Sequence, residues 1–199
     1  MATESLRVAA SRHGGFWTSD DWKALDFSIE KDWQTAIDIF EDRIRSRFLD
    51  VVEVFQTMRF SGFAVIAIDC LLIETLQQFY EGKAETPRGK SEEYFRKFLT
   101  QTSFDKFFDD EMAKRFYLQI RNGVLHQAEV KASSRVWLRK GKPLVQYAED
   151  RNGLLIHRKK FHHQLVHEFK DYVCRLRVTN PPNADLREKF KTKMDAICA

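Results

Sequence analysis

Apolar residues recur every three or four positions between residues 32 and 56, and this spacing predicts a long amphipathic helix from about Asp32 to Gln56. The opposite face carries acidic and basic side chains, as expected for a helix with one face in a core and the other in water. The apolar stripe consists of Trp33, Ile37, Phe40, Ile44, Phe48, Val52 and Phe55.

The segment from Gly62 to Tyr80 is apolar on nearly every side, which predicts a helix at the centre of a bundle or in an interface. Asp69 and Glu74 interrupt it. Because a buried carboxylate needs a partner, we expect these two residues to pair with arginines such as Arg43 or Arg45. The alternative is that they shape the electrostatics of an active site.

Further helices are predicted by capping residues and by apolar spacing of three and four. Ser91 followed by two glutamates is typical of a helix start, and Pro181-Pro182 must break the chain before the last helix. These helices cover about residues 91–99, 105–127, 161–177 and 184–197.

Short β-rich segments predict a small sheet in the last third of the chain. Residues 135–138 and 144–147 flank a turn at Gly141 and are expected to form a β-hairpin, to which residues 153–156 add a third strand. The predicted fold is therefore mainly α: a helical bundle with a small C-terminal β-hairpin or three-stranded elaboration at about 134–157. We expect residues 1–30 to be an N-terminal arm and residues 31–199 to be a single domain.

Composition places the chain among ordinary folded proteins. It has 199 residues, of which 43% are hydrophobic and 31% charged. A chain of this length can bury a core without disulfides or metal ions. Cys70, Cys174 and Cys198 are odd in number and widely spaced, which argues against disulfides and favours a reducing cytoplasm. The polar N-terminus does not resemble a signal peptide, and the apolar run at 62–73 is too short to span a bilayer.

Charge is distributed unevenly along the chain. Residues 131–199 contain 16 Lys and Arg against 7 Asp and Glu, whereas residues 1–130 carry a balance of −5. A basic C-terminal third suits a polyanionic partner such as RNA, although a solvated surface has the same composition.

The most informative motif is the segment Arg-Asn-Gly-Val-Leu-His at 121–126. RNA is cleaved when its 2′-hydroxyl attacks the adjacent phosphate, which requires proton transfer and stabilisation of the charged phosphorane. His126 can accept or donate a proton near neutral pH, and Arg121 presents a permanently charged fork of donors to phosphate oxygens. The expected products are a 2′,3′-cyclic phosphate and a 5′-hydroxyl.

Arg121, the polar Asn122 and a closing His126 resemble the signature of the HEPN superfamily, over roughly residues 32–130. The resemblance implies a helical bundle. Many members are metal-independent ribonucleases, which commonly assemble the active site from two motifs across a dimer interface and belong to toxin–antitoxin or antiviral systems. Other members are not catalytic, and residues 131–199 lie outside the resemblance.

Helical geometry qualifies how the motif can work. On an ideal α-helix, Arg121 and His126 are about 140° apart, whereas Asn122 and His126 share a face. We therefore expect Asn122 to orient His126 or touch phosphate, and Gly123 to let the helix loosen or end within the motif. Tyr117, one turn earlier, is expected to stack on a base or to hold the guanidinium of Arg121.

Two other groups of residues are candidates for binding. The first is a basic RNA-binding surface, for which a solvated face is the alternative. The second is the stripe His163, His167 and Asp171, which has metal-ligand spacing but is better explained as a polar helix face. The basic candidates are Arg139, Lys140, Lys142, Arg158, Lys159 and Lys160.

Together with the resemblance, the sequence predicts a cytoplasmic protein, and the resemblance implies a metal-independent endoribonuclease that works as a homodimer without a cofactor. RNA and an antitoxin protein are the expected partners, and no membrane is expected. The catalytic candidates are Arg121, Asn122 and His126. The alternative is a non-catalytic dimer that binds RNA or protein, and a weaker one is a metal enzyme that uses His163 and His167.

Overall fold

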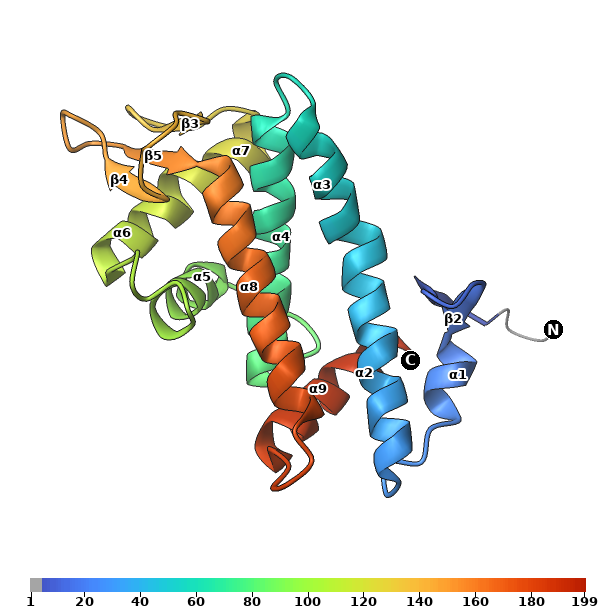
Figure 1. Cartoon of the computed structure of the whole chain (residues 1–199). Helices are drawn as coiled ribbons and strands as arrows, with labels where there is room; N and C mark the ends of the chain where they lie inside the picture. Colours follow the sequence, from blue (N-terminus) through green and yellow to red (C-terminus); the bar gives the residue numbers. More distant parts are fainter. Residues whose placement is uncertain (1–4) are drawn as a thin grey trace. The chain divides into compact units, whose positions relative to one another are not determined.

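A computed structural model describes residues 5–199 and shows a mainly helical protein with a few short strands (Figure 1). The chain divides into two compact units. Unit 1 comprises residues 1–51, 79–84 and 170–199, and unit 2 comprises residues 52–78 and 85–169. The predicted fold class, mainly α with a small β elaboration, is confirmed.

The first part of unit 1 contains the residues that we expected to form an N-terminal arm. Residues 1–4 lie outside the described part, and residues 5–30 contain real structure: β1 (Arg7–Ala10), β2 (Phe16–Thr18) and α1 (Ser19–Lys23). β1 and β2 pair antiparallel. Trp22 is buried, and its indole nitrogen donates to Asp195 at 2.9 Å. The buried side chain of Trp22 therefore attaches this segment to α9, although the segment is polar in average composition.

The remaining elements of unit 1 enclose a cluster of aromatic rings. They are α2 (Glu30–Ile44), η1 (Arg45–Leu49), the end of α8 (Arg158–Arg177) and α9 (Ala184–Ile197). η1 is a π-helical turn. Phe40 lies with its ring centroid 4.5 Å from that of Phe79, 5.4 Å from that of Phe190 and 5.9 Å from that of Tyr172. These rings come from four separate stretches of the chain, so they form the core of the unit.

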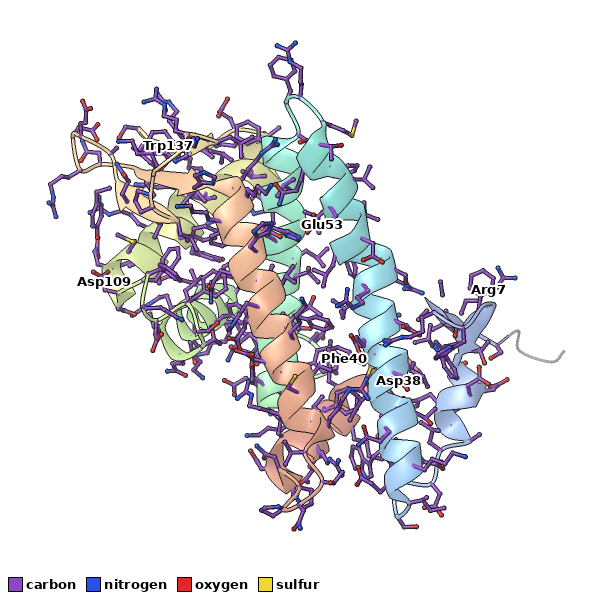
Figure 2. All side chains as sticks on the ribbon, in the orientation of Figure 1. Arg7, Asp38, Phe40, Glu53, Asp109 and Trp137 are labelled. Atoms are coloured by element: carbon purple, nitrogen blue, oxygen red, sulfur yellow. The ribbon has the colours of Figure 1, made fainter. Side chains whose placement is uncertain are left out.

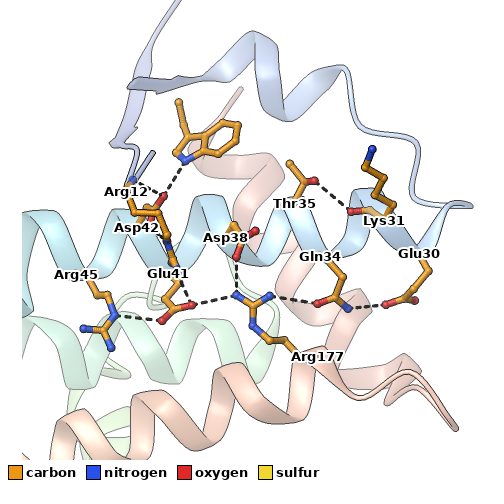
Figure 3. A network of polar contacts seen from close by, with 11 residues as sticks. Arg12, Glu30, Lys31, Gln34, Thr35, Asp38, Glu41, Asp42, Arg45 and Arg177 are labelled. Carbon is orange, nitrogen blue, oxygen red and sulfur yellow. Dashed lines mark hydrogen bonds and ion pairs between the residues drawn. The ribbon is translucent and has the colours of Figure 1, made fainter. Parts of the chain in front are cut away.

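A network of charged side chains covers one side of α2 in unit 1 (Figure 3). Arg177 donates to Asp38 at 2.7 Å and to Glu41 at 3.0 Å. Glu41 also pairs with Arg12 at 3.1 Å and with Arg45 at 3.1 Å. Glu41 thus receives three arginines at once.

Unit 2 contains most of α3 (Asp50–Thr57), α4 (Gly62–Glu81) as far as residue 78, and the first part of α8. It also contains α5 (Ser91–Gln101), α6 (Asp110–Arg115), η2 (Phe116–Arg121) and α7 (Asn122–Gln127). The predicted helix at 32–56 is present as the uninterrupted run of α2, η1 and α3. The helix expected from residue 105 begins five residues later, because Asp109 caps it by accepting from the backbone N–H of Met112 at 2.7 Å.

The core of unit 2 is again built from phenylalanines. Phe116 and Phe161 stack with an interplanar angle of 9° and a centroid distance of 5.0 Å, and Phe104 packs against Phe161 at 5.3 Å. The rings of Phe95, Phe98 and Phe108 are also buried. This core holds the helix that carries residues 116–127 against α5 and α8.

The three predicted strands are present, but their pairing differs from the prediction. β3 (Arg135–Trp137) and β4 (Val145–Tyr147) each pair with β5 (Leu154–His157), so β5 is central. The β3–β5 pair is parallel, and the β4–β5 pair is antiparallel. The predicted hairpin between β3 and β4 was wrong. The turn at Gly141 predicts only that the chain reverses there, whereas burial of Leu154 and Ile156 places β5 in the middle of the sheet.

α4 is the most apolar helix, and it is long and apolar enough to cross a membrane by length and composition. Half of its most apolar window is buried inside the protein. Asp69, near its middle, is fully buried and meets His162 of α8. These features are typical of the core helix of a bundle, as the sequence predicted.

Candidate functional site

The predicted motif lies where the π-helical turn η2 passes into α7. The backbone N–H of Asn122 donates to the carbonyl of Tyr117, five residues earlier, which is the π-helical pattern. α7 ends at Ala128, whose left-handed φ of 53° closes the helix. A π-turn inserts an extra residue into a helix and is frequent at functional sites.

The structure brings the three motif side chains together. The guanidinium of Arg121 donates through Nη1 to the amide oxygen of Asn122 at 3.1 Å, and the same nitrogen lies 3.3 Å from Nε2 of His126. Arg121 therefore reaches both of the other motif residues within the same chain, although it stands about 140° from His126 on an ideal helix. A helical wheel locates Cβ atoms, whereas a long arginine can fold back over the next turn.

The contact with Arg121 involves Nε2 of the His126 ring. A guanidinium only donates, so Nε2 is the atom that would accept in a hydrogen bond between the two side chains. His126 is exposed, whereas Arg121 and Asn122 are half-buried. The motif thus presents an imidazole to solvent with a cation directly behind it.

Glu74 of α4 completes the surroundings of Arg121. Nη2 of Arg121 lies 3.2 Å from Oε2 of Glu74, which also accepts from the hydroxyl of Ser91 at 3.1 Å. The partners that we expected for Glu74 bind elsewhere: Arg43 donates to the carbonyl of Val8, and Arg45 donates to Glu41. Sequence reasoning identified Glu74 as unusual but not its partner, because that pairing depends on how α4 and η2 pack.

Two aromatic rings hold the guanidinium of Arg121 from the other side. Its central carbon lies 5.4 Å from the centroid of Tyr117 and 5.8 Å from that of Phe95. Of the two roles expected for Tyr117, the structure shows the contact with Arg121. Nε of Arg121 is buried and has no hydrogen-bond partner among the described residues. The guanidinium of Arg121 is therefore packed between Glu74 and the two rings, and Glu74 offsets its charge.

Beside the motif, α4 and α7 form an apolar groove of about 410 Å³. Leu71 and Leu125 remain 45% and 43% exposed beside the half-buried ion pair of Arg121 and Glu74. The groove is lined by Ala67, Ile68, Leu71, Glu74, Thr75, Gln78, Arg121 and Leu125. Apolar surface of this kind suits contact with another macromolecule.

The six predicted RNA-binding residues have different environments. Lys140 and Lys159 are exposed, and exposed Arg139 stacks over the ring of Trp137 at 5.1 Å. The ammonium of Lys160 donates to the backbone carbonyl of Lys142 at 2.6 Å, which ties these two exposed residues together.

Arg158 is the member of this set whose predicted surface position was wrong. Its side chain is buried with 6% exposure, and burial lowers the pKa of its guanidinium. Nη1 donates to the hydroxyl of Ser61 at 2.6 Å, and Nη2 lies 3.5 Å from the carbonyl oxygen of Met58. Arg158 holds the turn between α3 and α4, because its position at the start of α8 points inward.

The histidine with the most unusual environment is His162, which the sequence did not single out. Nδ1 of His162 lies 2.7 Å from Oδ1 of Asp69, and both side chains are fully buried. Burial raises the pKa of Asp69, and the hydrogen bond from His162 opposes that shift. Oε1 of Glu53 lies 3.8 Å from Nε2 of His162. Glu53 is labelled on α3 in Figure 2.

The neighbouring metal candidates do not form a metal centre in the described part of the chain. His163 and His167 are exposed on α8, and residues 5–199 contain no group of three or more His, Cys, Asp or Glu side chains placed to hold a metal ion.

Comparison with known proteins gives no further assignment. No family model matches the chain, and no similar protein was found among curated proteins or among solved structures.

Proposed function

We propose that this protein is a metal-independent endoribonuclease of the HEPN type, with Arg121, Asn122 and His126 as its catalytic motif. The observation that carries the proposal is the 3.3 Å approach of the Arg121 guanidinium to the exposed His126 imidazole. That pair combines a proton acceptor with a phosphate-binding cation, as cleavage by the 2′-hydroxyl requires.

In the proposed reaction, Nη1 of Arg121 passes from Nε2 of His126 to a phosphate oxygen, and Nε2 then accepts the proton of the 2′-hydroxyl as the hydroxyl oxygen forms a bond to the adjacent phosphorus. The bond between phosphorus and the 5′-oxygen then breaks, and that oxygen must gain a proton. One imidazole nitrogen cannot accept and donate at the same moment, so the complete reaction needs a second proton donor. His126 of the partner subunit would supply it in a homodimer.

The exposed leucines beside the motif support dimerisation. Leu71 and Leu125 lie next to Arg121 in the groove, so a second copy that covered them would also bring a second motif close. On this proposal the protein acts in the cytoplasm without a cofactor. Its place among toxins or phage-defence effectors, restrained by an antitoxin protein, rests on the resemblance to the superfamily.

The test is cleavage of a labelled RNA by the purified full chain in EDTA, with analysis of the product ends. We expect a 2′,3′-cyclic phosphate, and Arg121→Ala or His126→Ala should each lower the rate by at least about 100-fold. His163→Ala, which removes another exposed histidine of unit 2, is the matched control and should retain activity. Leu71→Lys should abolish both dimerisation, measured by analytical ultracentrifugation, and cleavage.

Cleavage that survives both motif substitutions would refute the assignment. Activity that is lost in EDTA, restored by zinc and abolished by His163→Ala or His167→Ala would favour the metal-dependent alternative.

A second candidate function is a non-catalytic dimer that binds RNA or protein. The observation in its favour is the contact of Arg121 with Glu74. The carboxylate already offsets the positive charge of Arg121 that would otherwise bind a phosphate. Binding of RNA or protein without any cleavage, and with little dependence on His126, would support this candidate.

A further inference from the structure

The turn between α3 and α4 displays an aromatic ring that folding does not require. Phe60 is 94% exposed, the highest value among the large hydrophobic residues described as exposed. Its φ of 62° lies in the left-handed region, which a phenylalanine rarely adopts. Exposed apolar area and an unfavourable backbone both count against a phenylalanine here, so its presence points to a binding role.

The turn that carries Phe60 is held rigidly from below. The hydroxyl of Ser61 lies 2.5 Å from the carbonyl oxygen of Phe55 and 2.9 Å from that of Met58, and it accepts from buried Arg158 at 2.6 Å. A ring on an anchored turn loses little conformational freedom when it binds a ligand.

The surroundings of this turn are strongly basic. The stretches 54–68, 130–148 and 151–167 contain no Asp or Glu, but they contain ten Lys and Arg. The turn lies beside β3 and the start of α8, since a Cβ built on Gly62 would be 3.3 Å from Val136 and 3.7 Å from Arg158. Figure 1 shows the turn and β3 at the same end of unit 2. The exposed basic residues include Arg59, Arg139, Lys140, Lys142 and Lys159.

The catalytic candidate lies near the same end of unit 2. Leu125 of α7 lines the same groove as Ala67 and Ile68 of α4, and α4 begins at Gly62. The six residue steps of α-helix from Gly62 to Ile68 span about 9 Å. A nucleic-acid strand bound at the motif would therefore reach the turn.

We propose that Phe60 is a base-stacking residue for single-stranded RNA, on which an unpaired base lies while the surrounding lysines and arginines contact the phosphates. This inference rests on the proposed function for its ligand class. A single ring on a basic surface is the combination that binds unpaired bases. An anionic membrane is a poorer fit, because the guanidinium of Arg59 lies 5.4 Å from the Phe60 centroid and would enter the hydrocarbon with the ring.

The test measures binding of a labelled RNA oligonucleotide by fluorescence anisotropy, with full-length protein carrying His126→Ala so that the RNA stays intact. Added Phe60→Ala should weaken binding of the single strand by roughly 5- to 150-fold, the range for loss of one stack. Binding of a duplex of the same sequence should change little. Phe60→Trp should retain tight binding.

Phe16→Ala is the matched control, because Phe16 is also an exposed phenylalanine with an arginine, Arg7, over its ring, but in unit 1. Circular dichroism of each variant reports folding. Unchanged binding in Phe60→Ala, or an equal loss in Phe16→Ala, would overturn the inference. So would Phe60-dependent sedimentation with phosphatidylserine vesicles while RNA binding does not change.

The outcomes separate this inference from the proposed catalysis. Phe60-dependent binding of single-stranded RNA by a protein that never cleaves would support the stacking role and refute catalysis. Normal cleavage by Phe60→Ala, with an unchanged KM for single-stranded RNA, would refute the stacking role alone.

Discussion

At the scale of single residues, Gly123 lies at a position of the motif segment where a larger side chain has no room. The backbone of residues 129–131 crosses over it, and a Cβ at Gly123 would come within 2.4 Å of the carbonyl oxygen of Glu129. The sequence suggested that this glycine loosens the helix. It is instead buried inside α7 and permits a close approach of two backbones.

We expect Gly123→Ala to destabilise the protein by about 3 kcal/mol, because the added methyl group must displace backbone rather than a flexible side chain. Urea unfolding followed by circular dichroism measures the change. Gly62→Ala is the comparison, since its nearest contact is a methyl group of Val136 at 3.3 Å, and it should cost much less. Equal effects of the two substitutions would show that the crossing at Gly123 is not tight.

At the scale of elements, side chains between helices decide which faces meet. Asp69 and His162 join α4 to α8 within the apolar core of unit 2, and Oδ2 of Asp69 and Nε2 of His162 have no hydrogen-bond partner among the described residues. Such a pair adds little net stability, but it leaves an unpaired polar group if either member is removed.

Asp69→Ala should therefore cost about 3 kcal/mol, because His162 would remain buried without its partner. The double variant Asp69→Leu with His162→Phe should be clearly more stable than Asp69→Ala, since it buries no polar group there. Urea unfolding of the two variants makes the comparison, with the exposed His163→Ala as a control. A double variant that is less stable than the single one would contradict this account.

At the scale of the whole molecule, basic residues are concentrated in the last third of the sequence. The charged side chains are arranged differently in the two units. In unit 2 the stretches 54–68, 130–148 and 151–167 are basic and free of acids, and residues of the last two, Val136 and Arg158, lie beside Gly62 next to the Phe60 turn. In unit 1 the arginines Arg12, Arg45 and Arg177 converge on Glu41 (Figure 3). Burial raises the pKa of Glu41, but hydrogen bonds from these arginines outweigh it, so the pKa lies below the ordinary 4.5.

A carboxyl whose pKa is lowered by folding stabilises the native state above its unfolded pKa, and this contribution is lost as the pH falls through the folded value. The melting temperature should therefore fall between about pH 6 and about pH 3, and Glu41→Gln should reduce that dependence. Thermal melts across this range measure it. Glu188→Gln, an exposed change on α9, should leave the dependence as in the parent protein, and an unaltered slope in Glu41→Gln would contradict the role of the network.

The sequence by itself determined the helices, because the periodic stripes of apolar residues report burial directly. It also identified the segment 121–126 and the unusual carboxylates Asp69 and Glu74. Tertiary structure alone decided the partners. Arg121 meets Glu74 and His126, Asp69 meets His162, Arg158 turns inward to Ser61, and β5 lies between β3 and β4. The physical reason is that local spacing fixes where a side chain leaves its own element, whereas its contacts depend on elements far away in the chain.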